Sequence, residues 1–253
     1  AAISSGRQEA WFSKELANYS IKGKEPPKNW KARYVDAAPI ENSLGYDLPE
    51  SWNILAWDHL SIWITYGFTK PMPHVEVGPM IVTAKNVRNE GVTLDKIHYT
   101  TQEAFDSLRP KDKPSPGDIL IVKDGATTGR CCIAPTDISE YCVSQSVAVV
   151  WLDKSPMNRI YLLNWVQSEE IQKRIQKAMA GMAMPHLSIT DFRAMPVPPP
   201  PLAEQNEIVR LLEAAFSKID AIKLLHSKLK IQHSSLTQSL LAKAFRGELV
   251  PQD

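Results

Sequence analysis

Apolar residues in the middle of the chain gather in short runs that are rich in valine and isoleucine. Turn formers bound several of these runs, and the clearest is the Pro116-Gly117 pair in front of 118–123. Short β-branched runs between turn formers are typical of strands buried in a sheet. The pattern predicts strands at 80–84, 118–123, 130–134 and 146–151.

A helix is predicted after the last of these strands. Ser155 suits the N-cap and Pro156 suits the first turn, because proline has no N–H to leave unpaired there. Apolar residues then recur at helical spacing until Gly181, which favours a helix end. The recurring residues are Ile160, Leu163, Val166 (or Gln167), Ile171 and Ile175.

Four consecutive prolines, 198–201, separate this region from the last part of the chain. Proline fixes φ and cannot continue a helix, so an extended segment is predicted here. The stretch 202–246 then contains neither proline nor glycine, and Gly247 supplies a left-handed helix end. One helix of about 67 Å is predicted, at about 1.5 Å rise per residue.

Apolar side chains in this predicted helix alternate at spacings of four and three residues. This is the heptad pattern of a coiled coil, in which the apolar positions form a seam against a partner helix. Two histidines stand in the seam one heptad apart. The seam positions are Ile208, Leu212, Ala215, Ile219, Ile222, His226, Leu229, His233, Leu236 and Leu240.

Two arrangements are compatible with this helix. An ordinary amphipathic helix would lie on its own domain, but about 67 Å of helix exceeds the diameter of a compact domain, about 30–40 Å. We therefore expect a partner helix along much of the seam. The rings of His226 and His233 either lie at the edge of the seam or, as polar seam residues can, fix its register and partner.

Charge is distributed unevenly. Residues 1–34 have seven Lys and Arg against three acids (+4), 35–201 have fifteen against nineteen (−4), and 202–253 have seven against six (+1), which gives +1 in total. Nucleic-acid binding would therefore depend on local patches rather than on bulk charge. In the basic first part, Ser5 predicts the cap of a short helix over about 7–18, and a stretch broken by two prolines then suits a solvated linker.

These patterns divide the chain into three parts. Residues 1–47 are a polar and basic lead-in, 48–198 a mixed, strand-rich domain, and 199–253 the long helix. The predicted fold class is α+β, a strand-rich domain followed by one long coiled-coil-forming helix. With 43% apolar residues, the chain can bury a sizeable core.

Signature motifs of several enzyme classes are absent from the sequence. There is no GxGxxG turn, P-loop, HExxH or GxSxG motif, and no Asn-Pro-Pro-aromatic loop for amino-group methylation. The six histidines and three cysteines lack metal-ligand spacing, so we predict no metal site and three reduced thiols. No membrane-spanning run or signal peptide is evident, and we expect a cytoplasmic, non-catalytic protein.

Three polar clusters stand out: 83–89 leaves a predicted strand, 123–130 joins two predicted strands, and 144–146 is a third, smaller cluster. The middle one carries two glycines, which permit close backbone approach, between hydroxyl and cationic side chains. Such groups can reach phosphates, and amide or guanidinium side chains suit the edges of adenine or guanine. From local composition alone, a plain hairpin loop is the favoured interpretation of 123–130.

Three ordered segments resemble one known family. The run 114–121 with Gly125, Gly129 and Arg130 resembles a "pGDIL…G..GR" segment, 184–188 with 195–205 resembles an "hls…ipiPPl.EQ" junction, and 244–250 resembles an "aFrGeLv" helix end. These segments are typical of the target-recognition domains and spacer helices of specificity (S) subunits in type I restriction–modification systems. The resemblance spans about 48–250.

The resemblance implies a role in DNA recognition. S subunits hold two target-recognition domains apart with two antiparallel helices, and each domain reads one half of a bipartite site in double-stranded DNA. Methyltransferase subunits, which hold S-adenosylmethionine, and a translocating restriction subunit join this scaffold. This sequence has one such domain and one spacer helix, so the resemblance implies either a homodimer through the long helix or pairing with a second S half.

On this interpretation the polar clusters supply the candidate DNA contacts, although each residue also suits solvated surface. Two other hypotheses stay open: an assembly scaffold that does not read DNA, and an enzyme with an unrecognised active site. Salt-dependent DNA binding distinguishes recognition from scaffolding, and methyl transfer or cleavage by this chain alone would favour the enzyme. The candidate contacts are Lys85, Asn86, Arg88, Lys123, Thr127, Thr128, Arg130, Gln145 and His186.

Overall fold

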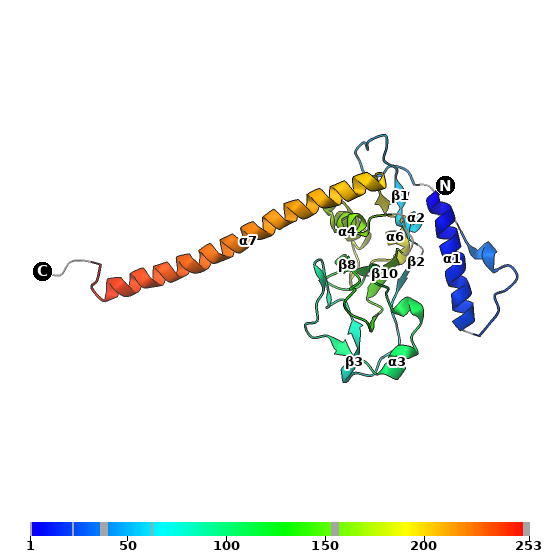
Figure 1. Ribbon diagram of the computed structural model, residues 1–253, viewed down its shortest axis with the longest axis horizontal. Helices are drawn as coiled ribbons and strands as arrows, with labels where there is room; N and C mark the ends of the chain where they lie inside the picture. The colour runs from blue at the N-terminus through cyan, green and yellow to red at the C-terminus, as the bar shows by residue number, and fades with distance from the viewer. Residues whose placement is uncertain (1, 22, 36–39, 62, 153–156, 250–253) are drawn as a thin grey trace. The chain divides into compact units, whose positions relative to one another are not determined.

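The computed structural model describes residues 2–21, 23–35, 40–61, 63–152 and 157–249 (Figure 1). Contacts within the chain divide it into two units, Ala1–Asn206 and Glu207–Asp253. The division lies inside the long helix rather than at the prolines. In chain order the elements are α1 (Ala2–Ile21), η1 (Trp30–Arg33), β1 (Leu55–Ala56), α2 (Trp57–Leu60), β2 (Trp63–Tyr66), β3 (Val75–Val82), β4 (Val87–Arg88), β5 (Gly91–Val92), β6 (His98–Tyr99), α3 (Gln102–Asp106), η2 (Pro110–Asp112), β7 (Ile119–Val122), β8 (Cys131–Ile133), β9 (Tyr141–Val143), β10 (Val147–Trp151), α4 (Arg159–Gln167), α5 (Glu169–Ala178), α6 (Ile189–Ala194), β11 (Pro196–Val197) and α7 (Leu202–Phe245).

A four-stranded antiparallel sheet, in the order β2-β10-β7-β8, forms the centre of the larger unit. All four residues of β7 are buried, which explains why this strand is a continuous apolar run. Leu120 and Val122 pack in one core cluster with Val82 and Val149, and α4 contacts β8 (Figure 1). The strands predicted at 118–123, 130–134 and 146–151 are confirmed as β7, β8 and β10, and the α+β fold class is confirmed with them.

A second sheet, in the order β6-β3-β9, lies beside this core. The run predicted at 80–84 is the end of the longer strand β3, and β3 pairs in parallel with β9 through Met80 and Tyr141. All three cysteines are buried free thiols in β8 and β9. Burial raises the pKa of Cys132 and of Cys142 to about 12, so these thiols stay protonated at neutral pH.

The turn before β7 is built from residues of the first family-like segment. Gly117 has a φ of 87°, and a β-carbon there would lie 1.8 Å from the Nη1 atom of Arg159. That Arg159 nitrogen donates to the carbonyl of Pro116 at 3.2 Å. The Asp118 carboxylate accepts from the backbone N–H of Ser115 at 2.8 Å. This glycine and aspartate therefore set where β7 begins.

The single helix predicted after β10 is wrong, because two helices, α4 and α5, occupy the region. Ser168 separates them with an extended backbone, and its hydroxyl donates to the carbonyl of Trp165 at 2.7 Å. The predicted start at 155–156 lies outside the described residues, and the described helix is capped by Asn158. Gly181, predicted to end the helix, has positive φ, but α5 already ends at Ala178.

The N-terminal helix α1 is longer than the predicted 7–18, and Ser5 lies inside it rather than in front of it. The following basic stretch does not behave as a plain linker, because it carries η1. Trp11 of α1 stacks on Trp30 of η1 with ring centroids 6.2 Å apart, and Phe12 lies edge-on to the same ring at 5.4 Å. Aromatic packing therefore holds this basic segment against α1.

Gln205 fixes the proline segment to the larger unit. Its side chain is 2% exposed. The amide nitrogen donates to the carbonyl of Pro200 at 2.8 Å, and the amide oxygen accepts from the backbone N–H of Asn158 at 2.9 Å. One buried amide thus joins the prolines, the first turn of α7 and the start of α4.

The second unit contains most of α7. The helix predicted over 202–246 is confirmed to within one residue, and Gly247 ends it with a φ of 76°. The seam residues Ile208 and Leu212 are half-buried, and the eight from Ala215 to Leu240 are exposed. In the described part of the chain no helix is long and apolar enough to cross a membrane.

Replacing Gln205 by Ala should lower the free energy of unfolding by about 1–3 kcal/mol, because buried polar partners lose their hydrogen bonds. Urea denaturation measures this change. The matched control is Gln238→Ala, an exposed position on α7, for which a change within about 0.5 kcal/mol is expected. Equal losses in the two variants would contradict this role for Gln205.

Candidate nucleic-acid interface

The loop 123–130 joins β7 to β8 as a hairpin. The N–H of Gly129 donates to the carbonyl of Val122 at 2.9 Å. A β-carbon at Gly129 would lie 2.7 Å from the Oε1 atom of Gln172, whose amide nitrogen donates to the Gly129 carbonyl at 3.0 Å. Gln172 of α5 therefore holds the base of the loop, and only glycine fits there without displacing it.

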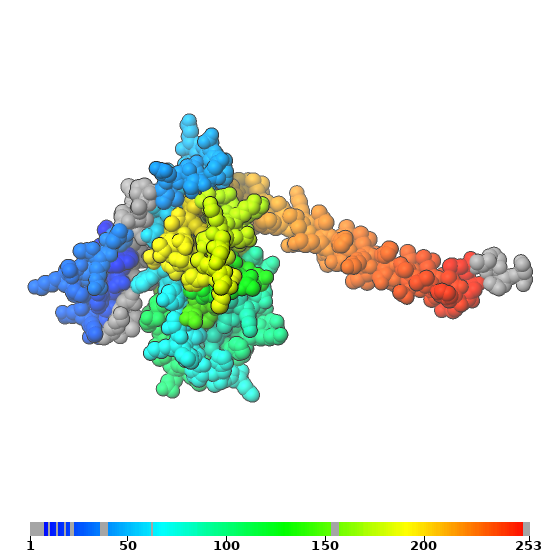
Figure 2. All heavy atoms as spheres, turned by 180° about the vertical axis from the view of Figure 1, so that it is seen from behind, coloured from blue at the N-terminus to red at the C-terminus, as the bar shows by residue number. Residues whose placement is uncertain are grey.

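A segment far along the sequence pairs with this loop. The N–H of Leu187 donates to the carbonyl of Lys123 at 2.7 Å, and the N–H of Gly125 donates to the carbonyl of Pro185 at 2.9 Å. In Figure 2 this yellow segment adjoins the green part of the chain on the face shown. Backbone pairing thus places the predicted contact His186 beside the predicted loop.

Three charged or titratable side chains form a chain of contacts at this junction. The Lys123 ammonium lies 2.7 Å from one carboxylate oxygen of Asp124, and the Nδ1 atom of His186 lies 2.6 Å from the other. Burial alone would raise the pKa of Asp124. Hydrogen bonds from Lys123 and His186, with their charges, outweigh that effect and hold the pKa below its usual value.

Ser146 connects the remaining two polar clusters to the loop. Its carbonyl accepts from the N–H of Lys123 at 2.9 Å, and its hydroxyl accepts from the N–H of Ala84 at 3.3 Å. The hydroxyls of Ser144 and Ser146 are 2.8 Å apart. The clusters predicted at 83–89, 123–130 and 144–146 are therefore hydrogen-bonded to one another at one edge of the domain.

A cavity of about 420 Å³ opens at this edge. Lys123, Gln145 and His186 line it, as members of the predicted set. The other lining residues were missed, because strand pairing and the fold of 187–190 bring them there, and only Leu187 and Ser188 stood in a family-like segment. They are Tyr66, Thr69, Leu187, Ser188, Ile189 and Thr190.

Four of the nine predicted contacts are exposed at this edge and can reach a ligand: Lys85, Arg130, Gln145 and His186. Two others, Arg88 and Thr127, are half-buried. Together they offer cations, an amide, an imidazole and a hydroxyl, which suit phosphate oxygens and base edges.

The side chains of the remaining three predicted contacts form hydrogen bonds or ion pairs within the protein. These residues are Lys123, Thr128 and Asn86. Lys123 is paired with Asp124, and its side chain is 10% exposed. The Thr128 hydroxyl donates to the carbonyl of Gly125 at 2.7 Å. These two side chains therefore hold the loop in shape.

Asn86 requires the clearest correction, because it is 1% exposed. Its amide oxygen accepts from the N–H of Thr83 at 3.1 Å and from the Thr83 hydroxyl at 2.9 Å. Its amide nitrogen donates to the carbonyl of Thr93 at 3.2 Å. Asn86 thus folds the turn between β3 and β4, and its amide does not face a base edge.

The described residues offer no group of three or more His, Cys, Asp or Glu side chains that could hold a metal ion. What they do offer is a constrained polar edge. The family model for the type I restriction modification DNA specificity domain matches residues 77–231, more than half of the 253 residues. The chain belongs to this specificity family.

Named members of the specificity family are similar along much of this chain. The specificity subunit of the type I restriction enzyme EcoDI from Escherichia coli is 37% identical over 263 aligned residues, which cover 95% of this chain and 54% of that subunit. The EcoBI specificity subunit, also from Escherichia coli, is 28% identical over 208 residues, 81% of this chain and 43% of that subunit. The chain thus spans about half the length of these relatives.

Two solved structures have folds similar to that of this chain. The HsdS subunit from Thermoanaerobacter tengcongensis has a TM-score of 0.58 at 21% identity, over 98% of this chain and 54% of its own. A chain from a structure of the type I R-M system gives 0.65 at 21% identity, over 98% of this chain and 55% of its own.

Replacing Asn86 by Ala should lower the free energy of unfolding by about 1–3 kcal/mol, because Thr83 and Thr93 lose buried partners. The control is the exposed neighbour Lys85→Ala, with an expected change within about 0.5 kcal/mol. Chemical denaturation of both variants gives the comparison. A stable Asn86→Ala protein with altered base preference would instead restore the predicted role in reading DNA.

Replacing Asp124 by Asn should destabilise the protein by about 1 kcal/mol at pH 7, where solvent screening limits the effect. Because the folded pKa of Asp124 is lowered from 3.8, its charged form adds stability above that pH. This contribution is lost as the pH falls through the folded pKa. Urea unfolding at pH 7 and near pH 3 should show the gap between variant and wild type shrinking, and a constant gap would contradict this account.

Proposed function

We propose that this chain is the DNA-recognition part of a type I restriction–modification complex, and that its larger unit reads one half of a bipartite site. The observation that carries the proposal is the joining of three separated polar clusters and His186 at one edge, in a member of the specificity family. Hydrogen bonds within the edge leave Lys85, Arg130, Gln145 and His186 exposed for the ligand.

This edge suits DNA because its exposed groups differ in what they recognise. Arg130 and Lys85 suit phosphate oxygens or guanine, and the Gln145 amide suits adenine. Loop backbones that are fixed by Gln172 and Ser146 keep these groups at constant spacing, as base reading requires. The charge of −4 over 35–201 means that steering to DNA by net charge is weak, so partner subunits would add to the grip.

The relatives are named as specificity subunits of type I restriction enzymes, and the family resemblance implies the partners. We infer a methyltransferase subunit, with S-adenosylmethionine bound to that subunit, and a restriction subunit that acts on the same DNA in the cytoplasm. This chain itself would perform no reaction.

Most of helix α7 would be the spacer. Along it, Ile222, Leu229 and Leu236 are 53–65% exposed, and large apolar side chains at heptad spacing are suited to a second helix. A second copy of this chain, in a two-fold dimer, or the second half of an S subunit would supply that helix. In either case two reading edges would be held at a fixed separation.

Replacing Arg130 by Ala should weaken duplex binding about tenfold and reduce the slope of log K against log [salt] by about 0.9, the loss of one phosphate contact. Fluorescence anisotropy with duplexes selected from a random pool, with methyltransferase partner present, measures both. The control is Lys177→Ala, exposed on α5 and not among the residues that line the cavity at the candidate interface. If wild type selects no sequence and binds no duplex, the chain is an assembly scaffold instead.

Replacing His226 and His233 together by Leu should raise the melting temperature of the paired helix and relax partner choice, because polar seam residues fix register at a cost in stability. Sedimentation and thermal unfolding measure the two effects. His226→Asn with His233→Asn is the control, since it keeps polar seam positions. Unchanged stability and an unchanged oligomer would contradict a role for these residues in the seam.

A further inference from the structure

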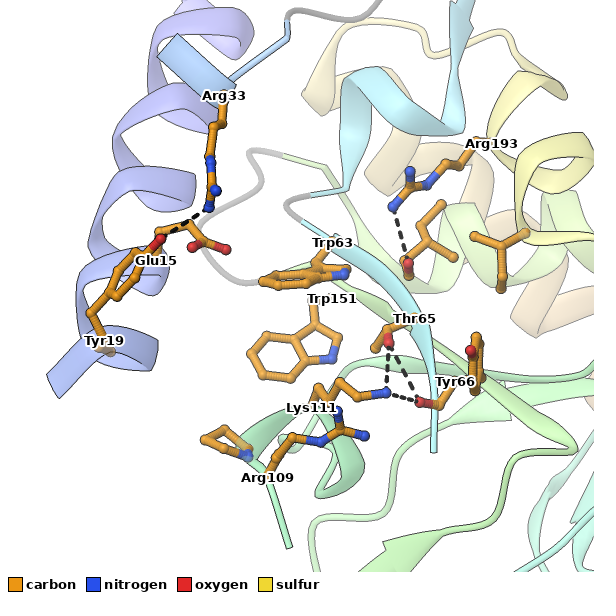
Figure 3. Close-up of a pocket in the computed structure, with 14 residues that line it drawn as sticks. Glu15, Tyr19, Arg33, Trp63, Thr65, Tyr66, Arg109, Lys111, Trp151 and Arg193 are labelled. Carbon is orange, nitrogen blue, oxygen red and sulfur yellow. Dashed lines mark hydrogen bonds between the residues drawn. The ribbon is translucent and has the colours of Figure 1, made fainter. Parts of the chain in front are cut away.

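A second cavity, of about 750 Å³, lies next to the candidate interface (Figure 3). Tyr66 and Ile189 line both cavities, so the two are neighbours. One wall comes from β2, η2, β10 and α6, and the opposite wall comes from α1 and η1. The volume falls within the range of about 300–1,000 Å³ that is usual for small-molecule sites.

Two tryptophans form a flat aromatic part of this cavity. Trp63 of β2 and Trp151 of β10 are register partners on neighbouring strands. Figure 3 shows their indole rings side by side and directed toward α1. Both are half-buried, so they are held by the fold and still reach the cavity. Both line the cavity, and indole rings stack well on planar bases.

Cationic side chains lie beside these rings. The Lys111 ammonium donates to the carbonyl of Tyr66 at 2.9 Å and lies 4.8 Å from the centre of the Tyr66 ring. The Arg109 side chain is 60% exposed. Asp112 lies behind the two, 3.5 Å from Lys111 and 3.3 Å from Arg109, and orients them. A phosphate at the mouth of the cavity would meet two positive charges.

The balance of charge among the lining residues favours an anion. Four of the fourteen described lining residues are cationic and one is acidic, while Asp112 pairs with two of these cations and Asp58 with a third. Burial, the largest influence, lowers the pKa of Lys111 although Asp112 opposes it, so an anion alongside would relieve the cost of keeping this group charged. The charged residues are Arg33, Arg109, Lys111, Arg193 and Glu15.

The side across from the tryptophans also carries polar groups. Arg33 of η1 donates to the hydroxyl of Tyr19 on α1 at 3.0 Å (Figure 3). This bond holds the guanidinium on the α1 side of the cavity. Polar groups on two sides and aromatic rings between them match a ligand with a flat ring at one end and a phosphate at the other.

We propose that this cavity binds a single nucleotide, with its base against Trp63 and Trp151 and its phosphate at Lys111 and Arg109. The site goes beyond the reading edge, because it recognises nucleotide chemistry rather than the sequence of a duplex. Two sources share that chemistry: a free mononucleotide, or one nucleotide of a strand that continues from the neighbouring edge past Tyr66.

Photocrosslinking distinguishes these sources. The full chain is irradiated with 5-iodo-2′-deoxyuridine monophosphate, or with a single-stranded oligonucleotide that carries one 5-iododeoxyuridine, and crosslinked peptides are mapped by mass spectrometry. Crosslinks at Trp63 or Trp151 are expected. Labelling by the monophosphate identifies a free nucleotide as the ligand, and labelling by the oligonucleotide alone identifies a strand.

The variant Arg109→Gln with Lys111→Gln should weaken binding of the labelled probe at least about tenfold, whereas Lys177→Gln should leave it unchanged. With the monophosphate as probe, Arg130→Ala should also leave binding unchanged, so loss of duplex reading and loss of this site are separable. The proposal is overturned if neither probe labels these tryptophans in the wild-type chain. It is equally overturned if inorganic phosphate at the same concentration displaces the probe completely, because the base would then contribute nothing.

Discussion

The buried strand β7 is the constraint on which the larger unit depends. It has a neighbour on each side and no exposed residue, so its position cannot shift without exposing core side chains. At its beginning, Gly117 and Asp118 fix the turn that starts it. The polar loop begins at Lys123, directly after the last residue of β7. The buried strand therefore fixes the position at which the loop begins. Burial in the sheet thereby determines where the candidate DNA contacts of the loop lie.

Hydrogen bonds between segments that are far apart in the sequence then assemble the polar edge around this loop. Ser146 joins the loop 123–130 to the β3–β4 turn, and the backbone of 185–187 pairs with the same loop. The side chains of Asn86 and Lys123 form hydrogen bonds and ion pairs within the protein. Other predicted contacts, such as Gln145, stay exposed. Gln205 acts in the same way, because its one buried amide hydrogen-bonds the proline segment to the start of α4.

Elements whose evidence lies in their own residues could be predicted from the sequence, and features that depend on contacts made in the fold could not. Strand β7 and helix α7 were predictable because a continuous apolar run, or a long stretch bounded by proline and glycine, carries its own evidence. The break at Ser168 was missed because it depends on a bond to the Trp165 carbonyl. Asn86 was misassigned because composition does not tell whether an amide faces solvent or its own turn. Tyr66 was missed because only pairing of β2 with β10 brings it to both cavities.

The central claim is that one edge of the larger unit selects a DNA sequence while α7 sets the distance to a second edge. Co-purification with a methyltransferase subunit, followed by mapping of every methylated base in genomic DNA, tests it most directly. The account predicts methylation within one two-part sequence whose halves are separated by a constant gap. Methylation without a shared sequence, or at halves separated by varying gaps, would contradict it.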